Sequence, residues 1–414
     1  MVARFLIHAH EIRETTAATV HHRRAVGYNS ANRLDRLVPL SSIRRSSLMV
    51  NSTQQLHRLG QSLWLDNITR GMLDDGTLAR YIRDLSVTGL TSNPTIYNSA
   101  VKNTTFYDAA IAAKVKQGTA GEQLFFELAI EDLRRAADLF RPIHDRTGGL
   151  DGWVSLEVSP TLAYDTASTL AAARDLHARA DRPNLYIKIP GTPEGLPAIE
   201  EAIFAGVPVN VTLLFTTAHY LAAAEAYLRG IDRRIEAGLS PQVCSVASLF
   251  ISRWDGATAA QLPPGLANGL GIAIGQQCYR AYRDLLASDR FQRLANFGAL
   301  PQRLLYASTG TKDPKLSDSL YVSALASPNT VNTMPEQTLL AFADHGSLSG
   351  IVSAGGGSAE ETLFAISRAG IDIAALGGKL QKDGADSFVK SWNELLEVIV
   401  KKSQAVTAAG GTAR

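Results

Sequence analysis

The sequence predicts an α/β protein whose one large domain is a (β/α)8 TIM barrel with additional C-terminal helices. Short apolar segments alternate with long segments rich in alanine and leucine, a pattern typical of parallel strands joined by helices. Eight such apolar segments occur in 414 residues, and eight buried parallel strands more often close into a barrel than form one open sheet. Hydrophobic residues make up 45% of the chain, which is enough for one large core.

The predicted strands follow one another along the chain, and most of them end on a polar residue. They occupy residues 62–65, 87–90, 153–156, 185–190, 209–212, 243–248, 304–308 and 330–332. The longest predicted helices have apolar residues at helical spacing and occupy residues 124–140, 163–180, 216–236 and 266–295. A closing helix, 387–401, is expected to pack over the barrel. The glycine-rich segment 353–358 lacks the lysine of a P-loop and follows no convincing strand, so we interpret it as a connector.

Lys188 stands in the middle of the apolar segment 185–190, where an ammonium group is costly unless it has a partner or a chemical role. Burial disfavours the charged form of an amine, and a neutral amine attacks carbonyl carbons to form Schiff bases. A snorkelling or ion-paired lysine is the alternative explanation, and for a lysine taken alone it is the more common one. The polar residues at the ends of the other predicted strands favour a chemical role for Lys188 over a structural one.

In a barrel of this kind the active site lies at the carboxyl ends of the strands, where the candidate residues gather. Asp66 ends the first predicted strand, and Asn93 follows the second. Side chains alternate along a strand, so three pairs of residues are each expected to point the same way, into the barrel: Ser155 with Glu157, Asn210 with Thr212, and Ser248 with Phe250. One amine, two carboxylates and several hydroxyls and amides therefore converge on one small cavity.

Seven segments, in order and at suitable spacing, resemble the transaldolase family. They are residues 64–67 (WLDN), 91–95 (TSNPT), 155–158 (SLEV), 186–190 (YIKIP), 210–215 (NVTLLF), 248–253 (SLFISR) and 308–312 (STGTK). The resemblance extends from about residue 54 to about residue 401. Each segment alone is common, whereas the whole set is highly specific. The resemblance implies that a dihydroxyacetone unit passes from sedoheptulose 7-phosphate to glyceraldehyde 3-phosphate through a Schiff base on Lys188, with no cofactor.

The resemblance also implies a role for each candidate residue. Asp66 matches the family's acid/base for C–C cleavage, and from the sequence alone a helix N-cap is an equal alternative. Glu157 and Thr212 match the pair that holds a catalytic water, a role that is compatible with an ion pair between Glu157 and Lys188. The residues expected to contact the substrate or line its pocket are Asn93, Ser155, Asn210, Ser248 and Phe250. Of these, Asn93 is alternatively a turn residue and Phe250 ordinary barrel core.

Phosphate is expected to bind further out. Arg253 lies just past the sixth predicted strand, and its guanidinium group suits a phosphate dianion. Part of the family carries an arginine two residues after the serine of the seventh strand, whereas this chain has Gly310 there, as another transaldolase branch does. We therefore expect Ser308, Lys312 and backbone amides near Gly310 to take over phosphate binding. A lysine at a helix C-terminus or facing solvent is the competing explanation for Lys312.

Composition narrows the possible partners and compartment. The net charge is only +2, which argues against nucleic acid, and no apolar stretch is long and uncharged enough to span a membrane. Cys244 and Cys278 are the only cysteines, and their spacing indicates neither a disulfide framework nor a zinc site. We therefore expect a cytoplasmic enzyme that acts on sugar phosphates, with no metal; a homodimer is compatible with the sequence.

The N-terminal residues 1–48 differ in kind from the barrel, which is assigned to residues 49–403. They contain many arginines, few acids and no lysine. Three explanations are open: an organellar targeting segment, a disordered arm, or translation from an upstream start, since Met49 precedes the region of resemblance. We favour the last two. Residues 404–414 are small and polar and are expected to form a flexible tail.

Three other functions need to be weighed. Fructose 6-phosphate aldolase resembles transaldolase in fold and lysine but releases the three-carbon fragment, and a tyrosine typically helps to hold its water, where this chain has Glu157. Deoxyribose-phosphate aldolase is a more distant Schiff-base barrel. A non-catalytic sugar-phosphate-binding barrel would be natural if Lys188, Asp66 or Glu157 were absent, but all three are present.

Overall fold

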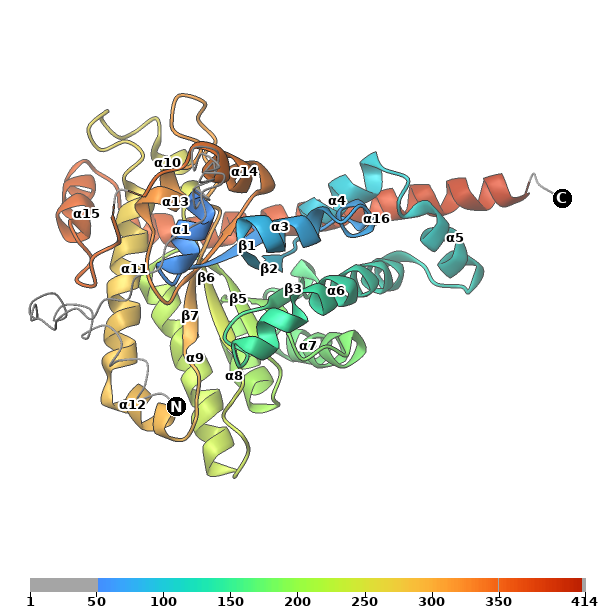
Figure 1. Cartoon of the computed structure of the whole chain (residues 1–414), viewed down its shortest axis with the longest axis horizontal. Helices are drawn as coiled ribbons and strands as arrows, with labels where there is room; N and C mark the ends of the chain where they lie inside the picture. Colours follow the sequence, from blue (N-terminus) through green and yellow to red (C-terminus); the bar gives the residue numbers. More distant parts are fainter. Residues whose placement is uncertain (1–50, 349, 412–414) are drawn as a thin grey trace, which may run out of the picture. The chain divides into compact units, whose positions relative to one another are not determined.

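The computed structural model describes residues 51–348 and 350–411 and confirms the predicted fold class (Figure 1). Eight parallel strands pair in chain order, and the eighth pairs with the first, so the sheet closes into a barrel. The strands are β1 (Ser62–Asp66), β2 (Val87–Thr91), β3 (Trp153–Glu157), β4 (Leu185–Pro190), β5 (Val209–Leu214), β6 (Ser245–Phe250), β7 (Gln302–Ala307) and β8 (Val331–Met334). The predicted extension 1–48 lies outside the described residues.

The strands agree closely with the apolar segments of the sequence. Almost every strand residue is buried, as expected for a parallel sheet with helices outside and packed side chains inside. The sixth and seventh strands lie about two residues from their predicted places. Val243 forms a turn with Pro241 in place of a strand, and β6 continues to Phe250 because Phe250 still pairs with Ala307 of β7.

Helices connect and surround the strands. They are α1 (Ser52–Arg58), α2 (Arg70–Asp74), α3 (Thr77–Leu85), α4 (Pro94–Asn103), α5 (Asp108–Lys116), α6 (Gly121–Arg146), α7 (Thr166–Ala180), α8 (Gly195–Phe204), α9 (Thr217–Glu236), α10 (Ser252–Thr258), α11 (Leu270–Ala287), α12 (Asp289–Asn296), α13 (Leu320–Ala324), α14 (Glu336–His345), α15 (Ala359–Arg368) and α16 (Ile373–Gly411), with a 3₁₀ turn η2 (Pro160–Leu162). The additional helices after β8 are thus α14, α15 and α16.

Two predicted helices have different limits in the structure. The predicted helix 266–295 is interrupted at Ser288, whose backbone is extended and whose Oγ accepts from the N–H of Phe291 at 3.3 Å, so that α12 starts anew. The closing helix begins earlier than predicted, at Ile373, and continues to Gly411 through most of the segment 404–414. The backbone of residues 404–411 is helical, and the predicted flexibility of the tail 404–414 stays a prediction. Residues 350–358 form no helix or strand, in agreement with a connector.

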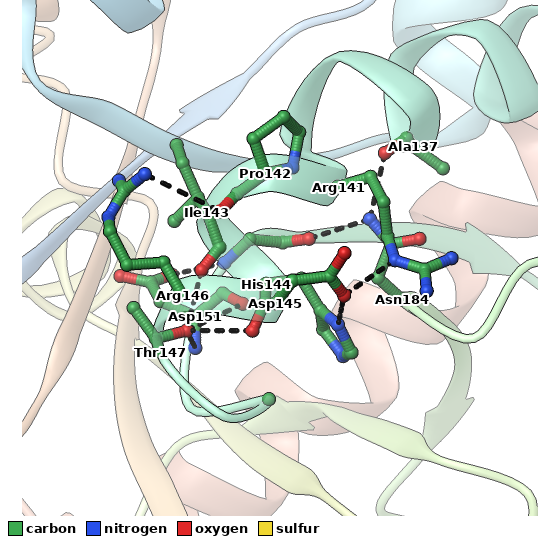
Figure 2. A network of polar contacts seen from close by, with 12 residues as sticks. Ala137, Arg141, Pro142, Ile143, His144, Asp145, Arg146, Thr147, Asp151 and Asn184 are labelled. Carbon is green, nitrogen blue, oxygen red and sulfur yellow. Dashed lines mark hydrogen bonds and ion pairs between the residues drawn. The ribbon is translucent and has the colours of Figure 1, made fainter.

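The side chains of Asn184, just before β4, and Thr147, just after α6, connect α6 to the segment that leads into β3 (Figure 2). Asn184 Nδ2 donates to the carbonyl oxygens of Ala137 at 2.9 Å and Gly152 at 2.8 Å. Thr147 Oγ1 accepts from the backbone N–H of Asp151 at 3.1 Å. These bonds satisfy backbone groups where the chain turns from helix to strand, and they hold the backbone around Asp151 in place.

The Asp151 carboxylate belongs to a buried polar cluster that fills the N-terminal end of the barrel. It accepts from the indole N–H of Trp64 at 2.9 Å. Arg303, on β7, donates to the carbonyl oxygens of Leu150 at 3.0 Å and Thr330 at 2.7 Å. The Ser62 hydroxyl joins the two groups, since it donates to Asp151 and accepts from Arg303 Nη2 at 2.8 Å, so the polar groups at this end of the barrel have a structural role. The candidate chemistry lies at the opposite end.

The last helix, α16, packs against α4, α5, α6 and the end of β5 (red in Figure 1). Its apolar residues face the core, with Phe388, Trp392, Leu395 and Ile399 buried. The prediction that this helix packs over the barrel is therefore confirmed. Among the described residues, no helix combines the length and the apolar character needed to cross a membrane.

Candidate active site

Lys188 lies on β4 with its side chain turned into the barrel, and the residue is only 5% exposed. Its Nζ is 3.3 Å from Glu157 Oε2 on the neighbouring strand β3 and 3.4 Å from the carbonyl oxygen of Ser92. Strand register puts Glu157 directly beside Lys188. The ion pair that was one explanation of this lysine therefore exists, and the amine also lines a cavity of about 440 Å³ at the carboxyl ends of the strands.

Asp66, at the end of β1, is a second carboxylate on the wall of this cavity. Its Oδ1 accepts from the Thr91 hydroxyl at 2.6 Å, and that hydroxyl also contacts the Thr333 hydroxyl at 2.7 Å. Burial raises the pKa of Asp66 above its usual range, although the positive charge of Lys188 opposes this effect. The alternative role as a helix N-cap is wrong, because Thr69 caps α2 by accepting from the N–H of Met72.

Glu157 and Thr212 occupy the two strands beside Lys188. Burial raises the pKa of Glu157, and the charge of Lys188 acts against this shift. Glu157 Oε1 and Thr212 Oγ1 are both buried, and neither has a hydrogen-bond partner within the described part of the chain. A buried carboxylate oxygen and a buried hydroxyl without partners are suited to holding a small polar molecule.

Asn210 joins three strands through its side-chain amide. Its Nδ2 donates to Ser155 Oγ on β3 at 3.1 Å, and its Oδ1 accepts from Ser248 Oγ on β6 at 2.7 Å. Ser248 and Phe250 line the cavity, and Ser155 and Asn210 are fully buried beside them. The predicted inward direction of these alternating residues is confirmed. The amide orientation is fixed by the two serines, so the Ser248 hydroxyl meets the cavity in a defined position.

Asn93 holds the start of α4 and also lines the cavity. Its Oδ1 accepts from the N–H of Ile96 at 3.1 Å, so it is the N-cap of that helix. The turn role and the cavity position predicted for Asn93 therefore coexist, because capping uses only the amide oxygen. The NH₂ group remains available as a donor.

Arg253 lies at the outer part of the cavity, in the first turn of α10. Its guanidinium carbon is 5.0 Å from the ring centroid of Phe250 and 5.8 Å from that of Phe388. Burial lowers the pKa of Arg253, but a guanidinium group stays charged at neutral pH. Arg253 has no acidic partner in residues 51–348 and 350–411, so its charge is available to an anionic ligand.

A family model described as Transaldolase/Fructose-6-phosphate aldolase matches residues 63–399. The chain belongs to this family. A protein named Transaldolase from Saccharopolyspora erythraea is 43% identical over 84% of this chain and 97% of its own length. The Transaldolase of Thermobifida fusca is 42% identical over 87% of this chain and 100% of its own length. Transaldolase 1 of Streptomyces coelicolor is 40% identical over 87% of this chain and 97% of its own length. The resemblance stated from the sequence is thereby confirmed.

The loop that follows the seventh strand lies close to the starts of α10 and α14. Ser308 follows β7 with a positive φ of 56°, and its hydroxyl contacts that of Ser252 at 2.9 Å. A Cβ added at Gly310 would lie 3.0 Å from Pro335 Cγ and 3.3 Å from Thr338 Oγ1, so a larger residue would need the start of α14 to yield. Lys312 is exposed at the cavity rim. All the predicted phosphate-binding positions thus border one cavity.

Sequence reasoning missed three residues of the site. Thr91 and Thr333 support Asp66, and the Phe388 ring lies 5.4 Å from Lys188 Nζ. Thr91 belongs to one of the segments that resemble the family, but no local signal gives it a role, and the pattern around Phe388 predicts only packing. Within the described residues, no cluster of three or more His, Cys, Asp or Glu is placed to hold a metal ion.

Proposed function

We propose that this protein is a transaldolase, in which Lys188 forms a Schiff base with a ketose phosphate and transfers a dihydroxyacetone unit to an aldose phosphate. The observation that carries the proposal is one buried amine that lines a cavity with the Asp66 carboxylate and lies 3.3 Å from a second carboxylate, Glu157; the pKa of both carboxylates is raised. Such an arrangement supplies a nucleophile and two proton-transfer groups without a cofactor. Membership of the family and the names of its relatives support the same reaction.

Imine formation is the first step. The Lys188 amine attacks the ketose carbonyl carbon, and the carbinolamine then loses water. Glu157 Oε1 and Thr212 Oγ1, both buried and without partners in the described structure, are the groups that orient a water molecule and relay these protons. The direct contact of 3.3 Å between Glu157 and Lys188 favours removal of a proton from the attacking nitrogen.

C–C cleavage follows from the imine. Asp66 removes the proton of the hydroxyl next to the breaking bond, the bond electrons pass to the iminium nitrogen, and an aldehyde leaves. The enamine that remains then attacks the acceptor aldehyde, and Asp66 returns its proton to the new hydroxyl. The raised pKa of Asp66 suits this alternation, because the group must both accept and donate a proton near neutral pH.

Arg253 is the group proposed to bind the substrate phosphate, together with Ser308, Lys312 and amides near Gly310. A planar guanidinium group without an acidic partner in the described structure is a strong phosphate ligand. Asn93, Ser248 and the buried pair Ser155 and Asn210 are proposed to position the sugar hydroxyls of the bound fragment.

Fructose 6-phosphate aldolase is the second candidate, since the family name includes both activities. The carboxylate of Glu157 beside Lys188 favours transaldolase, because the aldolase typically has a tyrosine to hold the water. A non-catalytic barrel is disfavoured because Lys188 and Asp66 line one cavity and Glu157 contacts the Lys188 amine.

Borohydride reduction in the presence of fructose 6-phosphate tests the proposal. We expect a dihydroxyacetone-derived mass on the peptide that contains Lys188. Lys188→Arg should abolish adduct and turnover, because a guanidinium group does not form the imine. Lys379→Arg, an exposed lysine of α16, is the matched control and should retain both. An adduct on another lysine would overturn the assignment, and rapid release of free dihydroxyacetone without an acceptor would favour the aldolase.

We also propose the limits of the catalytic unit, the compartment and the oligomeric state of the protein. The catalytic unit is taken as residues 49–403, the compartment as the cytoplasm, and a homodimer as compatible with the sequence. The free thiols of Cys244 and Cys278 are consistent with a reducing compartment. Fractionation of cells that express the tagged chain tests the compartment, and light scattering of the purified protein tests the oligomeric state.

A further inference from the structure

One face of α16 is fitted closely to the ends of β4 and β5. Gln381 Nε2 donates to the carbonyl oxygens of Gly191 at 3.0 Å and Leu213 at 2.9 Å. A Cβ added at Gly384 would lie 3.0 Å from Leu213 Cδ2 and 3.1 Å from Arg253 Nη1. The glycine therefore allows the helix to approach the barrel closely. The α16 backbone is thus fixed against the two strands that carry the reacting lysine and its neighbouring threonine.

Phe388 projects from the same face of α16, seven residues after Gln381. Its ring centroid is 5.4 Å from Lys188 Nζ and 5.8 Å from the guanidinium carbon of Arg253. The residue lines the cavity and is 7% exposed. One aromatic ring therefore lies within 6 Å of both the reacting amine and the cation proposed to bind phosphate. Phe388 thus lines the cavity as well as packing in the core, whereas Trp392 and Leu395 of the same helix are buried without lining this cavity.

We propose that Phe388 is a specificity-determining residue that covers the Schiff-base nitrogen and favours transfer of the three-carbon unit over its hydrolytic release. The inference rests on the proposed Schiff-base function of Lys188. The ring face attracts a cation within about 6 Å, so it stabilises the iminium nitrogen that replaces the ammonium group. Its apolar surface also excludes water from that side of the adduct.

Transfer and hydrolytic release both start from the enamine on Lys188. In transfer, the enamine carbon attacks the acceptor aldehyde, and the aldehyde oxygen becomes a hydroxyl. In hydrolysis, the enamine carbon takes a proton, water adds to the resulting iminium carbon, and the C–N bond breaks to give dihydroxyacetone and the free Lys188 amine. Only hydrolysis needs a water molecule at the iminium carbon before an acceptor has reacted. A ring that keeps water away therefore raises the ratio of transfer to release.

Phe388→Leu and Phe388→Ala test this role. With fructose 6-phosphate as donor and saturating erythrose 4-phosphate as acceptor, free dihydroxyacetone and sedoheptulose 7-phosphate are each assayed, and glyceraldehyde 3-phosphate measures total donor cleavage. We expect the fraction of cleavage events that release dihydroxyacetone to rise roughly three- to thirtyfold in Phe388→Ala. Phe388→Leu keeps an apolar cover without the π face, so its increase should be smaller. If the alanine variant does not fold, the leucine variant decides.

Leu395→Ala is the matched control. Leu395 lies on the same face of α16, seven residues after Phe388, and is fully buried without lining the cavity. Its truncation loosens the helix but should leave the partition unchanged. An equal rise in release from this control, or an unchanged partition in both Phe388 variants, would overturn the role of Phe388. Failure of the wild type to form any borohydride adduct at Lys188 would refute the proposed function instead.

Discussion

Asp66→Asn separates the two carboxylates of the site and is expected to raise stability while it removes activity. The substitution keeps the size of the side chain, and the amide oxygen of the variant still accepts from the Thr91 hydroxyl, which lies 2.6 Å from Asp66 Oδ1 in the wild type. What it removes is a charge. The raised pKa of Asp66 means that burial outweighs the attraction of Lys188, so the ionised carboxylate costs the folded state free energy at neutral pH.

The sign of the pH dependence follows from this direction. Stability from a carboxyl group with a raised folded-state pKa is fully present below its unfolded pKa of 3.8 and is lost as the pH rises through the folded value. Above the folded value the wild type has lost this stability, whereas the side-chain amide of the variant stays neutral at every pH. We therefore expect the melting temperature of Asp66→Asn to exceed that of the wild type by about 1–3 °C at pH 7, from roughly 1 kcal/mol of relieved burial. The difference should shrink as the pH falls through the folded pKa toward 3.8 and be absent below that value.

The kinetic effect should be confined to the C–C bond step. Loss of a general base typically costs about 10²–10⁴-fold, so cleavage of fructose 6-phosphate should slow by that factor while imine formation continues. The donor adduct should therefore accumulate and be trapped by borohydride in higher yield than in the wild type. Rapid quenching with mass detection of the Lys188 peptide measures both steps. A variant that forms the imine as slowly as it cleaves the bond, or that melts below the wild type, would refute this reasoning.

Glu157→Gln should instead slow imine formation and hydrolysis by about 10²-fold or more, because the glutamine amide next to Lys188 Nζ cannot take up a proton as the carboxylate does. A rate of borohydride trapping equal to that of Asp66→Asn would contradict the division of roles between the two carboxylates. Arg253→Ala should lower kcat/KM for phosphorylated sugars by roughly ten- to a thousandfold and change unphosphorylated fructose little, with a weaker effect of the same selectivity in Lys312→Ala. Equal losses for both substrates would mean that Arg253 only supports the barrel. Deletion of residues 1–48 should leave turnover and melting temperature nearly unchanged, since the proposed catalytic groups all lie within residues 51–411; a loss of folding would place that segment in the core or an interface.

The sequence was sufficient for the barrel and for the main candidates because both depend on local pattern. An apolar segment that ends on a polar residue already places that residue at the carboxyl end of a strand, as for Glu157. Lys188 is recognised by a different local signal, a lone ammonium group within an apolar segment. Whether Asp66 is an acid/base group or a helix N-cap could not be decided from the residues around it. It depended on Thr69, which caps α2 in its place, and on Thr91 from another strand.

Features that arise from the packing of distant segments were beyond the sequence patterns. Phe388 reaches Lys188 from a distant part of the chain because Gln381 fixes α16 to two strand ends. Leu213 adopts a positive φ of 60° where the register of β5 against β6 shifts, next to Thr212. A leucine rarely takes this conformation, so no local signal predicts it. The hydrogen bond from Gln381 to the Leu213 carbonyl then supports the unusual backbone.

The arrangement of charges explains how a buried site passes through the proposed cycle at low electrostatic cost. Lys188 carries the positive charge that opposes the raised pKa of both Asp66 and Glu157, and the iminium nitrogen would keep that charge at nearly the same place. When the C–C bond breaks, the nitrogen becomes neutral as the bond electrons reach it, and Asp66 becomes neutral as it takes the proton. The two charges disappear together. When two opposite buried charges form and disappear together, neither is left unpaired, and the free-energy penalty of a single buried charge is avoided. This requires the acid/base group to be electrostatically coupled to the lysine nitrogen. Asp66 meets this requirement from β1, because its pKa responds to the charge of Lys188.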